Sequence, residues 1–125
     1  MRRAIQTAVL AFGECLNRDG IEFHLVPEAQ EVSGMPCNIG LPRAILEGEV
    51  QKLFEGDKDA MKVIGKIEYG AVVEGWNSKE GIWSTDKTAV EKRAAKLRAW
   101  LYTRHEKHIV LVTHGAFLHY SDTNN

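Results

Sequence analysis

Three side chains of this sequence could act together on a bound anion: Arg3, Glu31 and His114. His114 follows Thr113 just past the apolar run of residues 109–112, which is typical of a strand buried on both faces of a parallel sheet. In open α/β sheets, ligands bind beyond the carboxyl ends of the strands. A histidine at such an end can protonate or hydrogen-bond an anion, and Gly115 beside it permits close backbone approach. A simple hydrogen bond from His114 to a nearby carbonyl is the structural alternative.

Two arginines stand at the start of the first predicted helix. Cations are unfavourable at the positive end of a helix unless an anion compensates them, and the arginine fork matches phosphate oxygens. Arg2 and Arg3 therefore indicate phosphate binding or, alternatively, a solvated chain end. Glu28 and Glu31 lie in a predicted long loop, where a carboxylate near a phosphate can donate a proton. Plain solvent exposure is the alternative for each of them.

The histidines do not favour a metal site. Their spacing superficially resembles that of metal ligands, but no carboxylate or cysteine clusters with them in the sequence. The residues concerned are His105, His108, His114 and His119. We expect neither a metal nor another cofactor.

The patterning predicts an α/β fold in a single domain over residues 1–125, with a mainly parallel sheet. Apolar residues at helical spacing predict helices, and β-branched runs predict strands. Residues 60–73 fit either a helix or an extended segment. The expected helices are 2–17, 42–54, 84–103 and a short one at 116–120, the strands are 21–26 and 109–112, and the loops are 27–42 and 75–84.

Composition narrows the choice of partners. A formal net charge of −1 and a pI near 6.5 give no reason to expect nucleic acid or an anionic membrane. No apolar run approaches the roughly 20 residues that span a bilayer. We expect Cys15 and Cys37 to be free thiols in a reducing, cytoplasmic compartment.

Five short motifs, taken in order, resemble the fungal-type branch of the histidine phosphatase superfamily, whose members are phosphoglycerate-mutase-like. Residues 2–8, Arg-Arg-Ala-Ile-Gln-Thr-Ala, look like the run with which the family's second arginine opens a helix. Residues 112–115, Val-Thr-His-Gly, look like the second-histidine motif. Residues 30–40, which contain Gln-Glu-Val-Ser and Pro-Cys-Asn-Ile-Gly, are similar to the loop of the acidic proton donor. Residues 75–81 and 115–120 are also similar to that branch.

This resemblance implies a three-layer α/β/α fold and phosphoryl transfer through a phosphohistidine without a metal. A small phosphorylated molecule, or phosphate itself, would be the partner. By the family pattern, Arg3 would clamp the phosphoryl group together with His114 and Gly115. Glu31 would protonate the leaving oxygen, and His114 would neutralise charge on the equatorial oxygens.

The sequence departs from the family in one important respect, because the Arg-His-Gly motif of the nucleophile is absent. We therefore expect a histidine-phosphatase-like chain that is truncated at both ends relative to the family, with weak or absent hydrolysis. The lost first strand would expose a strand edge, so we expect a homodimer or a domain-swapped oligomer. The alternatives are a non-catalytic anion-binding or regulatory module, an acid/base enzyme using Glu31 and His114, and a truncation product without function.

Overall fold

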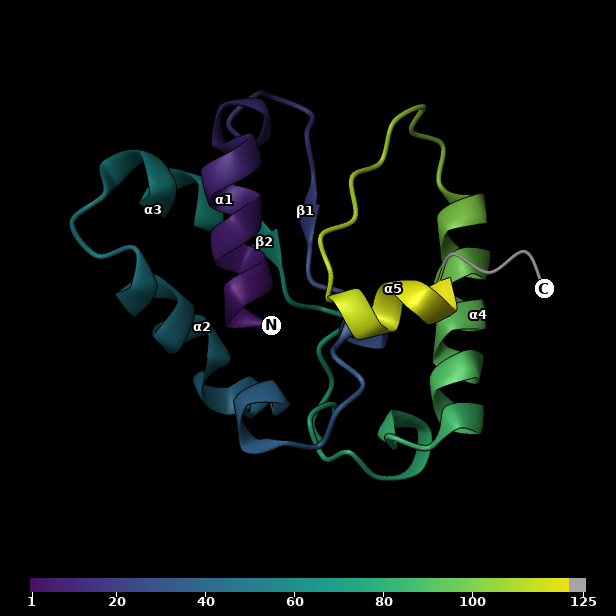
Figure 1. Ribbon diagram of the computed structural model, residues 1–125. Coiled ribbons are helices and arrows are strands. Elements are labelled where there is room, and N and C mark those ends of the chain that lie inside the picture. Colours follow the sequence, from purple (N-terminus) through teal and green to yellow (C-terminus); the bar gives the residue numbers. More distant parts are fainter. Residues whose placement is uncertain (122–125) are drawn as a thin grey trace.

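Helices dominate the computed structural model, which describes residues 1–121 and contains one small parallel sheet (Figure 1). Helices make up 54% and strands 3% of this described part, so the chain is a mostly helical small domain. The helices are α1 (Arg2–Leu16), α2 (Arg43–Leu53), α3 (Lys58–Ile64), α4 (Lys87–Thr103) and α5 (Gly115–Ser121), the strands are β1 (Phe23–His24) and β2 (Ile67–Glu68), and 3-10 turns occupy Pro27–Ala29, Pro36–Asn38 and Gly81–Trp83.

The predicted helices are confirmed, and their apolar stripes face the interior. Ile5, Ala8 and Val9 of α1 are buried, as the helical spacing requires. Phe12 belongs to the same stripe but is 38% exposed, which leaves its ring beside an open space. In α4, the stripe that begins at Val90 is likewise buried.

The ambiguous segment 60–73 divides into a helix and a strand. Asp57 caps α3, because its carboxylate accepts a hydrogen bond of 3.0 Å from the backbone N–H of Ala60. After α3 the chain enters β2, which pairs in parallel with β1 in the register Phe23 with Ile67. The predicted strand at 21–26 and the parallel pairing are therefore confirmed, although both strands are short.

The prediction of a strand at 109–112 is wrong, because the segment is extended but forms no hydrogen-bonded pairing with another strand of the described chain. A strand exists only where a neighbour supplies matching backbone groups, and no such neighbour lies beside this run within residues 1–121. Val110 is consequently 63% exposed. The fold is therefore helix-rich with a two-stranded sheet in its described part, and the wider parallel sheet expected from the sequence does not form.

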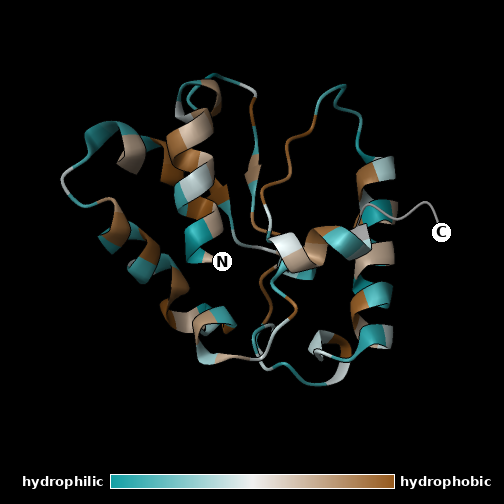
Figure 2. Cartoon of the chain, in the orientation of Figure 1, coloured by the Kyte–Doolittle hydropathy of each residue, from teal (hydrophilic) through white to brown (hydrophobic). Residues whose placement is uncertain are grey.

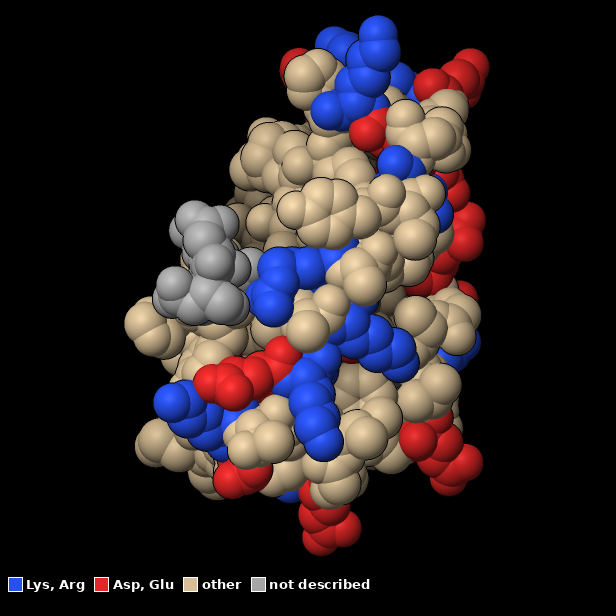
Figure 3. All heavy atoms as spheres, turned by 90° about the vertical axis from the view of Figure 1, so that its right-hand side faces the viewer, with Lys and Arg blue, Asp and Glu red and all other residues tan. Residues whose placement is uncertain are grey.

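Two hydrophobic cores lie on either side of β1. The first joins α1, α2, α3 and both strands around Trp76, and the second joins α4 and α5 around Phe117. In Figure 2 the hydrophobic colour marks β1 and also the extended segment that descends beside it toward α5. Figure 3 shows the α4 side of the molecule, where basic and acidic side chains are interspersed rather than collected into one charged face.

Two further sequence expectations concern the termini and the thiols. Cys15 and Cys37 are free, as predicted, and both are exposed. The tail that departs from the family pattern includes residues 122–125, which lie outside the described residues. Among the helices of the described chain, none combines the length and apolar character needed to cross a membrane.

The packing of Trp76 yields a prediction about Gly40. The indole is fully buried and donates from Nε1 to the Leu41 carbonyl at 3.0 Å, and a Cβ on Gly40 would lie 2.0 Å from its Cη2. We expect Gly40→Ala to lower the free energy of unfolding by about 1–3 kcal/mol, measured by urea denaturation.

Gly48→Ala is the matched control. Gly48 is an exposed residue in α2, and a Cβ there meets nothing within 4 Å. The same substitution at this position should raise stability by up to about 1 kcal/mol through helix propensity. Equal effects of the two substitutions would contradict the packing described for Trp76.

Candidate functional site

His114 lies where the extended segment turns into α5. Just before it, the hydroxyl of Thr113 donates a hydrogen bond of 2.6 Å to the carbonyl of Ala29. This contact fixes the end of the segment against the loop of residues 27–42. The imidazole of His114 is consequently held half-buried, and Gly115 follows it as the exposed first residue of α5.

Arg3 reaches the same loop from the first turn of α1. Its Nη2 donates to the side-chain oxygen of Asn38 at 3.0 Å and to the Cys37 carbonyl at 3.4 Å. The guanidinium remains exposed. These contacts orient one edge of the fork and leave its other nitrogens available to an anion.

Glu31 and Lys79 meet at the far side of the loop. The Lys79 Nζ donates to the backbone carbonyl of Glu31 at 2.6 Å, while the Glu31 carboxylate accepts from the Val32 N–H at 2.8 Å. Lys79 has a φ of 60°, a left-handed conformation that is uncommon for a residue with a Cβ. Burial and the neighbouring charge of Arg93 lower the pKa of Lys79 to about 8, against the opposing effect of Glu31.

These side chains form one electrostatic group, which we call the charge cluster: Arg3, Glu31, Lys79 and His114. Burial is the main reason that the pKa of His114 is lowered, and the Met1 amine, Arg3 and Lys79 lower it further while Glu31 raises it. Burial and these cations, which come from separate segments of the chain, therefore favour the neutral form of the imidazole. In the structure, Arg3 and Glu31 thus each act on the electrostatics of His114, with opposite signs.

Arg93 supports the loop that carries Glu31. It projects from α4, is only 4% exposed, and donates from Nη1 to the carbonyls of Glu28 (2.7 Å) and Gln30 (2.8 Å). Its guanidinium also lies 5.0 Å from the centre of the Phe117 ring. Burial lowers the pKa of Arg93 to about 10, and Nε and Nη2 have no hydrogen-bond partner among residues 1–121. The arginine therefore fixes the backbone beneath Glu31 at an appreciable desolvation cost.

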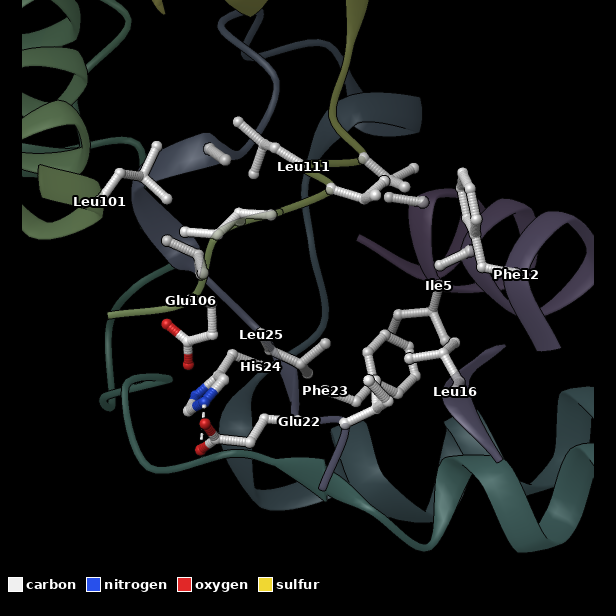
Figure 4. A pocket seen from close by; sticks show the side chains of 18 of the residues that line it. Ile5, Phe12, Leu16, Glu22, Phe23, His24, Leu25, Leu101, Glu106 and Leu111 are labelled. Atoms are coloured by element: carbon white, nitrogen blue, oxygen red, sulfur yellow. Dashed lines mark hydrogen bonds and ion pairs between the residues drawn. The ribbon is translucent and has the colours of Figure 1, made fainter. Parts of the chain in front are cut away.

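A cavity of about 380 Å³, which we call the groove, opens beside the charge cluster. Its walls are the inner face of α1, residues 20–26 with β1, and residues 108–112, and His114 also lines it. Figure 4 shows the apolar side chains of Ile5, Phe23 and Leu111 directed toward this space. His114 therefore belongs to the charge cluster and also lines the groove.

The opposite end of the groove is polar. Arg104 donates to Glu22 at 2.8 Å and to Glu106 at 2.6 Å, and the hydrogen bond from Arg104 lowers the pKa of Glu106 to about 2. In Figure 4 the carboxylates of Glu22 and Glu106 lie near His24, and a dashed line marks the 3.2 Å contact between Glu22 and His24.

One group of side chains within the described residues has metal-ligand spacing. The ligand atoms of Glu22, His24 and Glu68 lie within 4.8 Å of one another at the surface. The Glu22 carboxylate already bonds Arg104 and His24. A cation would have to displace the Arg104 guanidinium, so these residues form no dedicated metal site.

Sequence reasoning missed Lys79 and Arg93. Arg93 stands three residues after Val90, so helical spacing places it on the buried stripe of α4, and that signal could have identified it. Lys79 lies in an irregular loop with no periodicity, and nothing in its sequence neighbours indicates the contact with Glu31.

Comparison with known proteins adds no relative. No protein-family profile, no curated protein and no solved structure matches the chain.

The geometry predicts opposite effects of two substitutions on His114. Removing the carboxylate in Glu31→Gln takes away the charge that raises the pKa of His114, so that pKa should fall further. Removing a cation in Arg3→Gln should raise it. Titration of the imidazole by long-range ¹H–¹⁵N NMR measures both. Shifts of the same sign, or none, would show that the three side chains do not interact.

Proposed function

We propose that the charge cluster binds the phosphate group of a small phosphomonoester, and that the chain is a histidine-phosphatase-like protein with a phosphoglycerate-mutase-like ancestry. The observation that carries this proposal is that Arg3 and Lys79, from separate parts of the chain, both act on the pKa of His114, while Lys79 also bonds the Glu31 carbonyl. Cationic hydrogen-bond donors near one imidazole suit an oxyanion.

Electrostatics supports an anionic ligand. The pKa of Lys79 is lowered to about 8 because its ammonium is buried near Arg93, so the protein alone stabilises the cation poorly. A phosphate would supply the missing negative charge. It would raise the pKa of Lys79 and that of His114, and by linkage each protonated side chain would strengthen phosphate binding.

The same cluster supports binding rather than rapid hydrolysis. Transfer through a phosphohistidine requires a nucleophilic imidazole and, in the resembling family, a second histidine that stabilises the transferring group. Within the described residues, the charge cluster contains one histidine, His114. A single imidazole cannot fill both positions, so we propose a phosphate-binding protein with weak or absent hydrolysis.

The fold and the oligomeric state belong to this proposal as well. The order α1, β1 and the extended segment ending at His114 agrees with one part of a three-layer phosphoglycerate-mutase-like domain. Association of two chains would cover Ile109 and Val110, which are exposed apolar residues. Homodimer formation stays a prediction.

Phosphate binding should depend on the cluster cations. We expect inorganic phosphate to shift the amide resonances near Arg3, Lys79 and His114. Arg3→Gln and Lys79→Gln should each raise the dissociation constant for phosphate about tenfold, which corresponds to the loss of one charge-assisted hydrogen bond. NMR titration or calorimetry at fixed ionic strength provides the measurement.

Lys62→Gln is the control, because it removes the same charge from the exposed surface of α3, away from the cluster. It should leave phosphate affinity unchanged. Equal weakening by all three substitutions would mean non-specific attraction and would refute the proposal. Turnover of p-nitrophenyl phosphate that His114→Ala abolishes would show instead that the protein is an active phosphatase.

A further inference from the structure

The two walls of the groove are extended segments that run in the same direction without bonding to each other. β1 is paired with β2 on one edge, where the Leu25 N–H donates to the Glu68 carbonyl at 3.2 Å. Alternate residues of a strand present their backbone groups to opposite edges, so those of His24 point away from β2. Residues 105–113 make no backbone–backbone hydrogen bond within the described chain. Two unpaired strand edges therefore border one apolar cavity.

The ends of these segments are tied together while their middles remain apart. At the start, the guanidinium of Arg104 bridges the carboxylates of Glu22 and Glu106. At the finish, Thr113 bonds the carbonyl of Ala29. Residues 22–26 and 108–112 both line the groove between these ties. An inserted strand of five residues, about 16 Å long, matches this length.

A buried polar side chain in the groove lacks a partner. Gln30 is 4% exposed and lines the cavity. Its Nε2 donates to the Trp76 carbonyl at 2.7 Å, but its Oε1 accepts no hydrogen bond from the described part of the chain. A buried acceptor left empty costs about 1–3 kcal/mol. A ligand with N–H groups would satisfy it, whereas a purely hydrocarbon ligand would not.

The groove also has opposite charges at its two ends. The end at which both segments begin carries two carboxylates and one guanidinium, from Glu22, Glu106 and Arg104. The end at which they finish is lined by His114 and lies beside the cations of Arg3 and Lys79. A peptide lying parallel to β1 would place its amino terminus at the first end and its carboxylate at the second.

We infer that the groove binds an extended apolar peptide of about five residues as a parallel strand, with its free C-terminal carboxylate at the charge cluster. Backbone pairing on both edges provides affinity, as in other cases of strand addition, and the apolar walls select aliphatic side chains. The carboxylate uses the cations proposed above to bind phosphate. Only this end of the inference therefore rests on the proposed function, and phosphate should compete with the peptide carboxylate.

Synthetic peptides can test the inference on the full chain. The probe is a pentapeptide with the sequence of residues 108–112, His-Ile-Val-Leu-Val, as the free acid. The matched controls are its C-terminal amide and a form that is N-methylated at its third and fourth residues, which keeps the side chains but loses one donor on each edge. We expect the free acid to bind about tenfold more tightly than either control, and its shifts to map to β1 and residues 109–112.

Two variants locate the peptide. Arg3→Gln should abolish the preference for the acid over the amide while leaving the affinity for the amide unchanged. Ala8→Trp, which fills the groove from α1, should abolish binding of every peptide while circular dichroism shows an intact fold.

Equal binding of the N-methylated and unmodified peptides, or no binding of any peptide at about 1 mM, overturns the inference. Phosphate binding without peptide binding refutes the peptide inference but leaves the proposed phosphate site standing. Peptide binding to β1 and residues 109–112 without phosphate binding supports strand addition and refutes the proposed phosphate site.

Discussion

A charged side chain in the interior, Arg93, sets the geometry on which the candidate site depends. It is buried between α4 and the loop that carries Glu31, and within the described residues both of its hydrogen bonds go to backbone carbonyls rather than to a carboxylate. Burying a cation in this way is unfavourable unless the bonds are well formed. The cost is consistent with a positioning role, because the same residue joins the second core through Phe117 and holds the loop against the first core through Gln30.

The positive charge of Arg93 also influences the surface above it. It contributes to the lowered pKa of Lys79, whose ammonium is held against the Glu31 carbonyl. The lowered pKa of His114 arises from burial and from nearby cations. The lowered pKa values of His114 and Lys79 show that the cluster stabilises positive charge poorly. A bound anion, whether a phosphate or a terminal carboxylate, would supply the missing negative charge.

The sequence predicts most of the helical structure because helix formation depends on neighbouring residues. The stripe of Ile5, Ala8 and Val9 is a local signal, and it is buried as expected. The cap at Asp57 is also local, but the sequence left residues 60–73 ambiguous and did not predict it. The run at 109–112 has equally strong local preference for a strand, but a strand requires a partner that its own residues cannot supply. The extended conformation was therefore predictable, and the absence of pairing was not.

For the site, the sequence singles out Arg3, Glu31 and His114 through the resemblance, and in the structure Arg3 and Glu31 act on the pKa of His114. Lys79 was not predictable, because its contact with Glu31 spans 48 residues and depends on an irregular loop with a positive φ. The groove could not be predicted from the sequence either, because it lies between two segments whose contacts are at their ends.

The central claim is that these charges are arranged to receive an anion, and the protonation of Lys79 tests it most directly. The measurement is an NMR titration of the Lys79 ammonium with and without saturating inorganic phosphate. We predict a pKa of about 8 for Lys79 in the free protein that rises when phosphate binds. A Lys79 pKa that phosphate leaves unchanged would contradict the account.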